Sequence, residues 1–554
     1  MIDKKKVVLI SDFTSLEVCG GAELFNEELV NGLSKKGFEC ENLKSVEATA
    51  ELLRQNKDVF YIVANFMLLS EASKKALAYE GFSYSIIEHD WKMCKSNNPA
   101  LFENLVVPEE QIQNKEFFKA AKAVFCQSKL HSAIMQKNLL LKNIVNVGCN
   151  IWSDKTVEAL RVNIGKKKNR KVGILGSNNK NKGMPEAIQY CKENKINYEI
   201  IPFRDQEGFF EELAKTETLV MLPTWIETFC RVAIEARILG CKLITNKALG
   251  CASEEFFKLK GEELLNYVIA RKEKTIDLFE KVINGEEIEK FNSVKLPKVS
   301  VITTIYNAKK HIGGYLESIV NQTIFNESEL IIVDANSPEN EIETIKPYLD
   351  KYQNIRYVRT DERINTAKAF NVAAREHASG EYIASVMVDD RPSRDHLEVL
   401  AKHLMNNPDV SVIYGNCLQT NKPNETFENN TSRGKLYEHS ANDFTKENCI
   451  KLLMGPMPMY LKSIHDTVGW YDETFRYACD WKFMLEAVRK NHKLKKINKI
   501  VGLYYFNPTG ISTSNSDVEK TKEKHCEEKQ IFYEYKDVFP NNFDIFKPYF
   551  DSIG

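Results

Sequence analysis

The sequence predicts an α/β protein in which parallel strands alternate with helices in two successive regions. Short apolar runs typical of strands alternate with amphipathic runs through the first half of the chain, and the alternation restarts in the second half. Residues 284–298 (NGEEIEKFNSVKLPK) lie between these regions, are rich in charge and include a proline, as expected of a linker. We therefore expect a first region at residues 1–290, a second region at residues 297–515 and a C-terminal helical tail at residues 516–554.

The first region is expected to form two Rossmann-type halves. An amphipathic run at residues 22–35 exemplifies its helices. A polar, basic stretch at residues 163–170 (NIGKKKNR) predicts a hinge, so the halves span about residues 1–165 and 166–290. Strands are expected where β-branched and aromatic residues gather, at residues 7–10, 59–63, 85–87, 123–126, 171–175, 218–222 and 242–245.

The second region is expected to form a single α/β domain. A strand begins at residue 299, directly after the linker. The pattern then predicts helices at residues 311–322, 342–351 and 367–377, and further strands at residues 329–333, 355–359 and 382–388.

Composition excludes several classes of protein. Lys+Arg (76) and Asp+Glu (77) balance to a formal net charge of -1, so no nucleic-acid partner is expected. Thirteen cysteines without a CxxC pair indicate reduced thiols and a cytoplasmic location. The apolar run at residues 7–10 ends at Ser11-Asp12 and is too short to span a membrane. No transmembrane segment is expected, and peripheral association with a membrane stays open.

Two adjacent carboxylates, Asp389 and Asp390, follow the strand expected at residues 382–388. In open α/β sheets, ligands bind beyond the carboxyl ends of the strands. Two neighbouring carboxylates repel each other unless a cation bridges them, and Mg²⁺ or Mn²⁺ shared with a diphosphate would do so. The alternative is a solvated turn or a helix N-cap pair.

Two segments of the second region are distinctive: residues 299–337 (VSVITTIYNAKKHIGGYLESIVNQTIFNESELIIVDANS) and residues 378–390 (ASGEYIASVMVDD). They resemble the opening and the metal-binding strand of the family-2 type of inverting glycosyltransferase, which has the GT-A fold. The resemblance covers about residues 298–510 and implies a UDP-, GDP- or dTDP-sugar donor with Mg²⁺ or Mn²⁺. It assigns the nucleoside to Thr304, Tyr306 and Asp334, the base and diphosphate to Arg363 and Lys368, and the metal to Asp389 with Asp390 beside it.

One position departs from the pattern of that family. Met387 stands where an acid or asparagine would begin the family's metal motif. The metal would then be held by fewer protein ligands or more weakly. Magnesium keeps several waters and needs only one or two carboxylates, so a metal site is still expected.

Residues 469–487 (GWYDETFRYACDWKFMLEA) resemble the acceptor-side segment of the same family. An inverting transfer needs a general base to take the proton of the acceptor hydroxyl, and Asp480 is our candidate. Cys479 replaces a frequent acid of the family. The alternative for Asp480 is an ordinary helix N-cap, and the two roles are compatible. Trp470, Tyr471 and Trp481 are candidates either for stacking on a sugar or for core packing.

In the first region, residues 222–245 (LPTWIETFCRVAIEARILGCKLIT) place two glutamates, Glu227 and Glu235, eight positions apart. This segment resembles the spaced glutamate pair of retaining glycosyltransferases of the family-4 type, which have the GT-B fold. If Thr228 capped a helix, Glu235 would lie about two turns inside it. Gly21, at the expected start of a helix, suits the approach of a diphosphate or an acceptor. The resemblance also covers His89 in EHDW, as the active-site histidine, and Lys182 in NKNKGMPEAI, as the diphosphate lysine.

The companion arginine of that lysine is absent, because Ser177 lies near its expected position. Losing a bidentate arginine–phosphate contact would weaken donor binding or catalysis. Arg204 and Arg231 are the candidates to compensate.

We therefore expect a fused, two-domain glycosyltransferase that acts on a glycan or lipid-linked glycan. The second domain would be inverting and metal-dependent, with Asp480 as base. The first would be retaining, through Glu227, and would need no cofactor. In one alternative only the second domain is catalytic and the first is an acceptor-binding or docking module. In others the chain is a degenerate carbohydrate-binding scaffold or a nucleotidyltransferase. A nucleotidyltransferase should show a glycine-rich basic loop near the start of its fold, and residues 301–310 (VITTIYNAKK) contain none.

Overall fold

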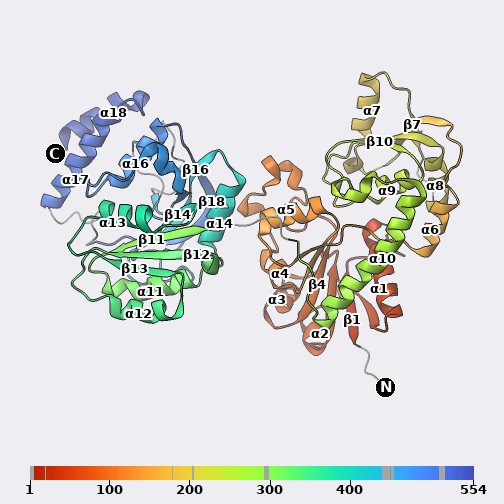
Figure 1. The fold of residues 1–554 in the computed structure, drawn as a ribbon, viewed down its shortest axis with the longest axis horizontal. Helices are drawn as coiled ribbons and strands as arrows, with labels where there is room; N and C mark the ends of the chain where they lie inside the picture. The colour runs from red at the N-terminus through yellow and green to blue at the C-terminus, as the bar shows by residue number, and fades with distance from the viewer. Residues whose placement is uncertain are drawn as a thin grey trace. The chain divides into compact units, whose positions relative to one another are not determined.

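A computed structural model gives the fold of the chain (Figure 1). The residues that it describes are 5–18, 20–177, 179–202, 205–291, 298–438, 444, 449–450, 455–508, 510 and 518–553. The chain divides into two compact units, Met1–Val294 and Lys295–Gly554.

Unit 1 begins with a six-stranded parallel sheet in the order β2-β1-β3-β4-β5-β6. β1, β3 and β4 are almost entirely buried, as expected of strands covered on both faces. The strands are β1 Lys6–Ser11, β2 Glu39–Lys44, β3 Phe60–Ala64, β4 Ser83–Glu88, β5 Val124–Cys126 and β6 Ile144–Asn146. The helices are α1 Gly21–Lys35, α2 Ala50–Gln55, α3 Glu71–Tyr79, α4 Lys115–Ala120, α5 Lys129–Leu139 and α6 Asp154–Arg161.

A second, four-stranded parallel sheet follows in unit 1, in the order β10-β9-β7-β8. Its strands are β7 Arg170–Leu175, β8 Glu199–Ile201, β9 Thr216–Met221 and β10 Lys242–Thr245. Its helices are α7 Met184–Glu193, α8 Gln206–Ala214 and α9 Arg231–Ile238. These parallel sheets with intervening helices confirm the α/β class expected from the sequence.

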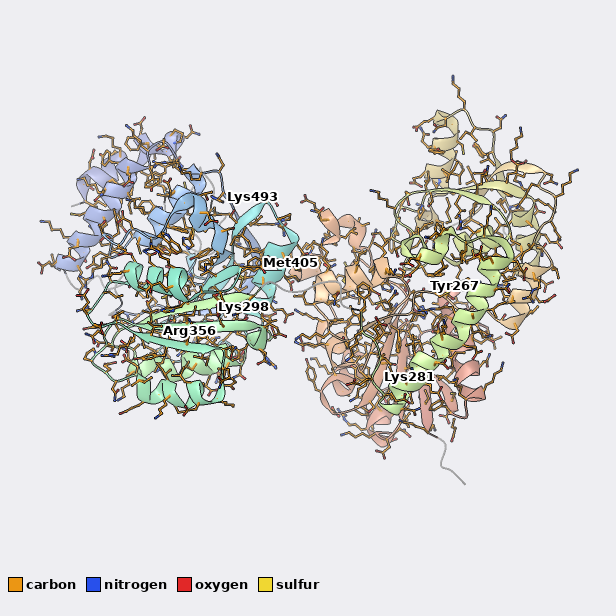
Figure 2. The ribbon with its side chains drawn as sticks, viewed as in Figure 1. Tyr267, Lys281, Lys298, Arg356, Met405 and Lys493 are labelled. Carbon is orange, nitrogen blue, oxygen red and sulfur yellow. The ribbon has the colours of Figure 1, made fainter. Side chains whose placement is uncertain are left out.

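The last helix of unit 1, α10 (Gly261–Asn284), belongs to two hydrophobic cores. Its first turns bury Leu264 and Val268 in the core around the second sheet. Its last turns bury Ile276 and Phe279 in the core around the first sheet, where Phe279 stacks on Phe125 at 3.8 Å between ring centroids. Figure 2 marks Tyr267 toward one end of the helix and Lys281 toward the other. The end of α10 therefore completes the core of the first half, although it follows the second half in sequence.

Unit 2 contains one mixed eight-stranded sheet in the order β13-β12-β11-β14-β17-β16-β18-β15. The first four of these are parallel, and β17 is antiparallel to both of its neighbours. The strands are β11 Val299–Ile305, β12 Ser328–Asp334, β13 Ile355–Arg359, β14 Tyr382–Ser385, β15 Arg391–Pro392, β16 Val410–Thr420, β17 Met459–Leu461 and β18 Lys493–Tyr505. The helices are α11 Lys309–Val320, α12 Ile342–Lys351, α13 Thr366–Val372, α14 His396–Asn406, α15 His465–Val468 and α16 Cys479–Arg489.

Two helices, α17 (Val518–Glu534) and α18 (Pro540–Ser552), form the C-terminal tail. They pack against α16, because Phe532 and Phe550 share a buried core with Trp481 and Met484. The rings of Trp481 and Phe550 are stacked at 6.5 Å. Among the described residues, none of the helices combines the length and the apolar composition needed to cross a bilayer.

Because α10 closes the core of the first sheet, Phe279→Ala should destabilise unit 1 by about 3–5 kcal/mol, the usual cost of truncating a fully buried phenylalanine. Hydrogen exchange followed by mass spectrometry would measure the two units separately. Peptides of β5 should lose protection, whereas peptides of unit 2 should keep theirs. Lys274→Ala, at an exposed position of the same helix, is the control. Equal protection of β5 in both variants would contradict the shared-core role of α10.

Candidate functional site

The carboxyl ends of β11 and β12 bring together three residues proposed from the sequence. Thr304 pairs with Val333, and the next pair in the parallel register is Ile305 with Asp334. Tyr306 follows directly after β11 and is half-buried. Thr304, Tyr306 and Asp334 therefore lie at one edge of the sheet, as ligand-binding residues of open α/β sheets do.

Asp334 is fully buried, and both of its carboxylate oxygens have protein partners. One oxygen accepts the Ser337 N–H at 2.6 Å. The other accepts the hydroxyl of Tyr357 and the guanidinium of Arg359, each at 2.5 Å. The exposed group at this point is thus Arg359, whose side chain is 41% accessible. The sequence analysis missed Arg359, although it ends the predicted strand at residues 355–359 and pairs in register with Asp334.

Arg363 and Tyr306, both proposed for donor binding, lie against each other. The guanidinium carbon of Arg363 is 4.1 Å from the centroid of the Tyr306 ring, a cation–π arrangement. Lys368 is half-buried in the first turn of α13, which Asn365 caps, and its ammonium is 3.6 Å from the Glu362 carboxylate.

Asp389 and Asp390 lie on a turn beyond β14. The strand expected to reach residue 388 ends at Ser385, because the Asp390 N–H bonds back to the carbonyl of Met387 at 3.1 Å and curls the chain. Asp389 is half-buried and Asp390 is buried, with one oxygen accepting the Tyr505 N–H at 3.2 Å. Burial and the neighbouring charge of Asp389 raise the pKa of Asp390 well above its ordinary value.

Arg391 is buried beside this pair, yet its guanidinium binds other groups. It donates to the carbonyls of Val388 at 3.0 Å, of Asp390 at 2.7 Å and of His311 at 3.2 Å. It also donates to the amide oxygen of Asn424 at 3.2 Å. Arg391 thus holds the backbone of the turn. Within the described ranges, no lysine or arginine forms an ion pair with either carboxylate.

The donor set at the turn fits a hard divalent cation. It offers two carboxylates that form no ion pair with a described lysine or arginine, although the charge of the buried Arg391 acts on both. Oxygen ligands are those that Mg²⁺ and Mn²⁺ prefer. The described parts of the chain contain no group of three or more histidine, cysteine or acidic side chains that could hold a metal. Asp389 and Asp390 would therefore hold the cation together with water and ligand oxygens.

Asp480 lies in the first turn of α16, and the helix N-cap is Ala478. One oxygen of Asp480 accepts the Trp481 N–H at 2.8 Å. Burial raises the pKa of Asp480 above its ordinary value. Asp480 is therefore not the N-cap of α16, the alternative weighed from the sequence; that position is Ala478, which has no side-chain oxygen.

Two tyrosines connect Asp480 with the strand-end carboxylates. The rings of Tyr437 and Tyr504 lie 4.2 Å apart. Burial raises the pKa of Tyr437 to about 12, and the charges of Asp390 and Asp480 both add to that rise. Both carboxylates are therefore close enough to act on one phenol. No local sequence pattern points to this pair, because the two tyrosines are far apart in the chain.

The three aromatic residues considered for sugar stacking pack within the protein instead. Trp470 stacks on His465 at 4.3 Å between centroids, with the guanidinium of Arg375 at 4.6 Å. Tyr471 packs against Phe370 and Phe483, and the Trp481 indole donates to the carbonyl of Cys449.

In unit 1, the structure joins Lys182 and Glu227. The Lys182 ammonium lies 2.8 and 3.0 Å from the two carboxylate oxygens of Glu227. Lys182 ends a 3₁₀ turn before α7, and Glu227 lies in the segment between β9 and α9. Desolvation opposes the charge of Lys182, but the negative charge of Glu227 raises its pKa above the ordinary value.

The helix expected to be capped by Thr228 begins later, at Arg231, with Cys230 as its N-cap. The Thr228 hydroxyl instead donates to the carbonyl of His89 at 2.6 Å, so it joins the two halves of unit 1. Glu235 therefore lies in the second turn of α9. It accepts the Trp152 indole N–H at 2.9 Å and is 3.6 Å from the Arg231 guanidinium.

Gly21 begins α1 and lies beside Arg231. A Cβ on Gly21 would be 3.1 Å from the Cδ of Arg231. The Arg231 guanidinium donates to Asn150 at 2.7 Å and to the Ile151 carbonyl at 2.8 Å. Ser177 is half-buried, and Arg204 lies outside the described residues.

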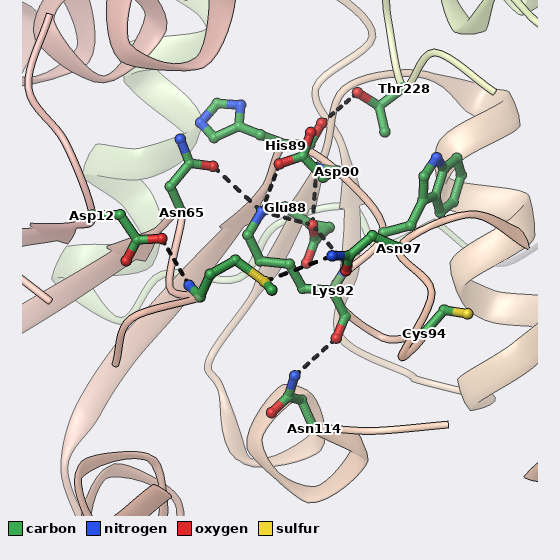
Figure 3. Close-up of polar contacts among 12 residues, drawn as sticks. Asp12, Asn65, Glu88, His89, Asp90, Lys92, Cys94, Asn97, Asn114 and Thr228 are labelled. Carbon is green, nitrogen blue, oxygen red and sulfur yellow. Dashed lines mark hydrogen bonds and ion pairs between the residues drawn. The ribbon is translucent and has the colours of Figure 1, made fainter. Parts of the chain in front are cut away.

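His89 and its neighbours form a buried polar cluster (Figure 3). The His89 ring contacts Asn26 through Nε2 at 2.9 Å and Gln127 through Nδ1. Three residues after His89, the buried ammonium of Lys92 lies 3.0 Å from Asp90 and 3.4 Å from Glu88. The charge of Asp90 also acts on Lys182, which links the cluster to the Lys182–Glu227 pair. The sequence analysis missed Lys92, because nothing in the local pattern predicts a buried lysine.

Residues 300–469 match the model of glycosyl transferase family 2. An uncharacterized glycosyltransferase of Methanocaldococcus jannaschii is 26% identical over 267 residues, which cover 46% of this chain and 87% of that protein. Chondroitin synthase of Pasteurella multocida is 25% identical over 253 residues, covering 45% of this chain and 24% of the synthase. These findings place a family 2 glycosyltransferase domain in this chain, which is an enzyme of the glycosyltransferase class.

Among solved structures, the crystal structure of Staphylococcus aureus TarS residues 1–349 is similar to 44% of this chain. The similarity covers 69% of that structure, with 19% sequence identity and a TM-score of 0.34. A score this low supports no conclusion about fold or ligands.

Burial lowers the pKa of His89 to about 3, so we expect its ring to stay neutral from pH 8 down to about pH 4. A neutral ring can donate from Nε2 to Asn26 while it accepts at Nδ1 from Gln127. An NMR titration of histidine labelled at Cε1 would measure this, with the signal assigned by its loss in His89→Gln. An inflection near pH 6.5 for that signal would contradict the prediction.

Proposed function

We propose that unit 2 transfers a sugar, with inversion, from a nucleotide diphosphate sugar to a hydroxyl group of a glycan or lipid-linked glycan, in a GT-A arrangement. The observation that carries this proposal is the pair of carboxylates Asp389 and Asp390 on the turn beyond β14, inside the segment that matches the family 2 model. Asp480 lies in the first turn of a helix, and its charge and that of Asp390 both act on Tyr437. We assign the leaving-group side to the strand-end pair and the acceptor side to Asp480.

The chemistry proceeds by one displacement. The acceptor oxygen attacks the anomeric carbon as the bond from that carbon to the diphosphate oxygen breaks. Asp480 takes the proton of the acceptor hydroxyl, and the nucleotide diphosphate leaves with the bonding electron pair. The raised pKa of Asp480 suits this role, because a general base is most effective when its pKa approaches the working pH.

The leaving diphosphate needs positive charge, and two features of unit 2 supply it. Asp389 and Asp390 would hold Mg²⁺ or Mn²⁺, which neutralises negative charge on the diphosphate oxygens when bound. Arg359 ends β13 beside Asp334 of β12, and Arg363 packs on Tyr306, directly after β11. Tyr306 and Thr304 would contact the nucleoside, whereas the saturated Asp334 would act by fixing Arg359.

We infer for unit 1 a second, metal-independent transfer that retains configuration, in a GT-B arrangement of its two halves. Lys182 would bind the donor diphosphate, and Glu227, Glu235, His89 and Gly21 would line the same site. The contact between Lys182 and Glu227 supports this role, because a lysine held by one carboxylate can exchange that partner for a phosphate.

A second candidate for unit 1 is an acceptor-binding or docking module. Three observations favour it. No arginine stands at position 177, the Arg231 guanidinium is directed to Asn150 and Ile151, and Glu235 is bound by Trp152. Under this alternative, only unit 2 releases nucleotide diphosphate.

We also propose that the protein acts in the cytoplasm and that its donors are UDP-, GDP- or dTDP-sugars.

Asp389→Asn should lower the metal-dependent release of nucleotide diphosphate at least a hundredfold, because a bridging carboxylate is lost. Asp480→Asn should lower it about a hundred- to ten-thousandfold by removing the base. Release from a panel of UDP-, GDP- and dTDP-sugars with and without Mn²⁺ measures both. Asp409→Asn, an exposed aspartate paired with Lys493, is the control. Full activity of Asp389→Asn would contradict the metal role of this pair.

For unit 1, Lys182→Met should abolish any metal-independent release of nucleotide diphosphate, because the diphosphate loses its cation. Lys180→Met, two residues away and exposed, should keep that activity within about twofold. The same donor panel without metal, in the Asp389→Asn background, isolates unit 1. If the Asp389→Asn protein with an intact Lys182 releases nucleotide diphosphate from none of the donors, the docking role of unit 1 replaces the catalytic one.

A further inference from the structure

The segment that leads into Asp480 is held by a carboxylate of the C-terminal tail. Glu527, on α17, accepts three consecutive backbone N–H groups. One of its oxygens accepts from Arg476 at 2.6 Å, and the other accepts from Tyr477 at 2.8 Å and from Ala478 at 3.0 Å. Ala478 is the N-cap of α16 and precedes Asp480 by two residues.

These bonds anchor the chain just before the helix. The first N–H groups of an α-helix have no intrahelical partner. Of these, Glu527 accepts the N–H of the N-cap residue Ala478, as the glutamate of a capping box does, and its other two bonds hold the two residues before it. A carboxylate is also favoured at this end of a helix by the helix dipole. Glu527 therefore fixes the start of α16 from another helix.

Further contacts fix α17 in place along α16. The Tyr477 hydroxyl donates to Glu523 at 2.7 Å, one turn before Glu527. The Lys482 ammonium bridges Asp472 at 2.9 Å and Glu534 at 3.1 Å. Because these bonds extend over the length of both helices, a shift of α17 would be transmitted to the start of α16.

We propose that Glu527 is a positioning residue for the transfer reaction, which holds residues 476–478 so that Asp480 faces the acceptor side of the site. The inference rests on the proposed role of Asp480 as base. It makes the C-terminal tail part of the active unit, although the tail itself carries no catalytic motif.

The charges around Asp480 provide a reading that is independent of folding. Burial raises the pKa of Asp480, the charge of Lys524 lowers it and the charge of Glu527 raises it. Asp480 interacts electrostatically with five described titratable groups: Tyr437, Tyr471, Cys479, Lys524 and Glu527. A base works when deprotonated, so activity rises with pH through its pKa. Removing Glu527's charge should move that acid limb to lower pH, and removing Lys524's charge should move it to higher pH.

The test compares Glu527→Gln, Lys524→Met and the control Glu519→Gln, which makes the same charge change at an exposed site of α17. The assay is metal-dependent release of nucleotide diphosphate from the donor that the wild type uses best in the sugar-nucleotide panel. We expect kcat of Glu527→Gln to fall about ten- to a hundredfold, with KM for the donor within about twofold and the acid limb shifted as stated. Glu519→Gln should match the wild type.

Two results would overturn the inference by themselves, and a third would remove its premise. One is a wild-type kcat and pH profile in Glu527→Gln while Asp480→Asn is inactive. The other needs no turnover: hydrogen exchange at the amides of residues 476–478 that is as slow in Glu527→Gln as in the wild type. If Asp480→Asn keeps full activity, the proposed base is wrong and the inference falls with it. Thermal unfolding of each variant separates a loss of kcat from a loss of folded protein.

Discussion

The main electrostatic constraint of unit 2 is a pair of neighbouring carboxylates on the turn beyond a strand. Among the described residues, no lysine or arginine forms an ion pair with either of them. Asp389 and Asp390 repel each other, and burial increases the cost of charging Asp390. Arg391 stabilises the turn that carries them, because its guanidinium donates hydrogen bonds to backbone carbonyls. The charge of Arg391 offsets part of this repulsion, and the proposed metal would balance the rest.

Unit 1 meets the same problem with its own cations. Glu227 is paired with Lys182, Glu235 with Arg231, and the buried Glu88 with Lys92. Each carboxylate there already has a positive partner, so an incoming diphosphate would compete for lysine or arginine rather than share a metal. The two units therefore treat similar acidic groups in opposite electrostatic ways, which accords with the metal-dependent and metal-independent roles proposed for them.

Periodicity and strand-end position were enough to predict the α/β class and to place Asp389 beyond the end of a strand, because those features depend on local sequence. Tyr306 and Asp334 were assigned through the resemblance to family 2. Sequence could not reveal Lys92, Tyr437 or Glu527, since each acquires its role from residues brought near by tertiary packing. It also misplaced the start of α9, because Thr228 bonds to His89 across the two halves rather than to its own helix. Long-range contacts, rather than weak local helix or strand propensities, account for most of these differences between sequence prediction and structure.

The helix α10 has a consequence for how the chain is made. The first sheet is complete once Asn146 has been synthesised, but the ring that stacks on Phe125 belongs to Phe279. Residues of α1 already pack on the same face, but at roughly 5–20 residues per second the part that α10 covers stays exposed on the ribosome for on the order of ten seconds. During that interval the nascent first half has an incomplete core, so it is the stage at which chaperones have an apolar surface to bind and at which aggregation competes with folding.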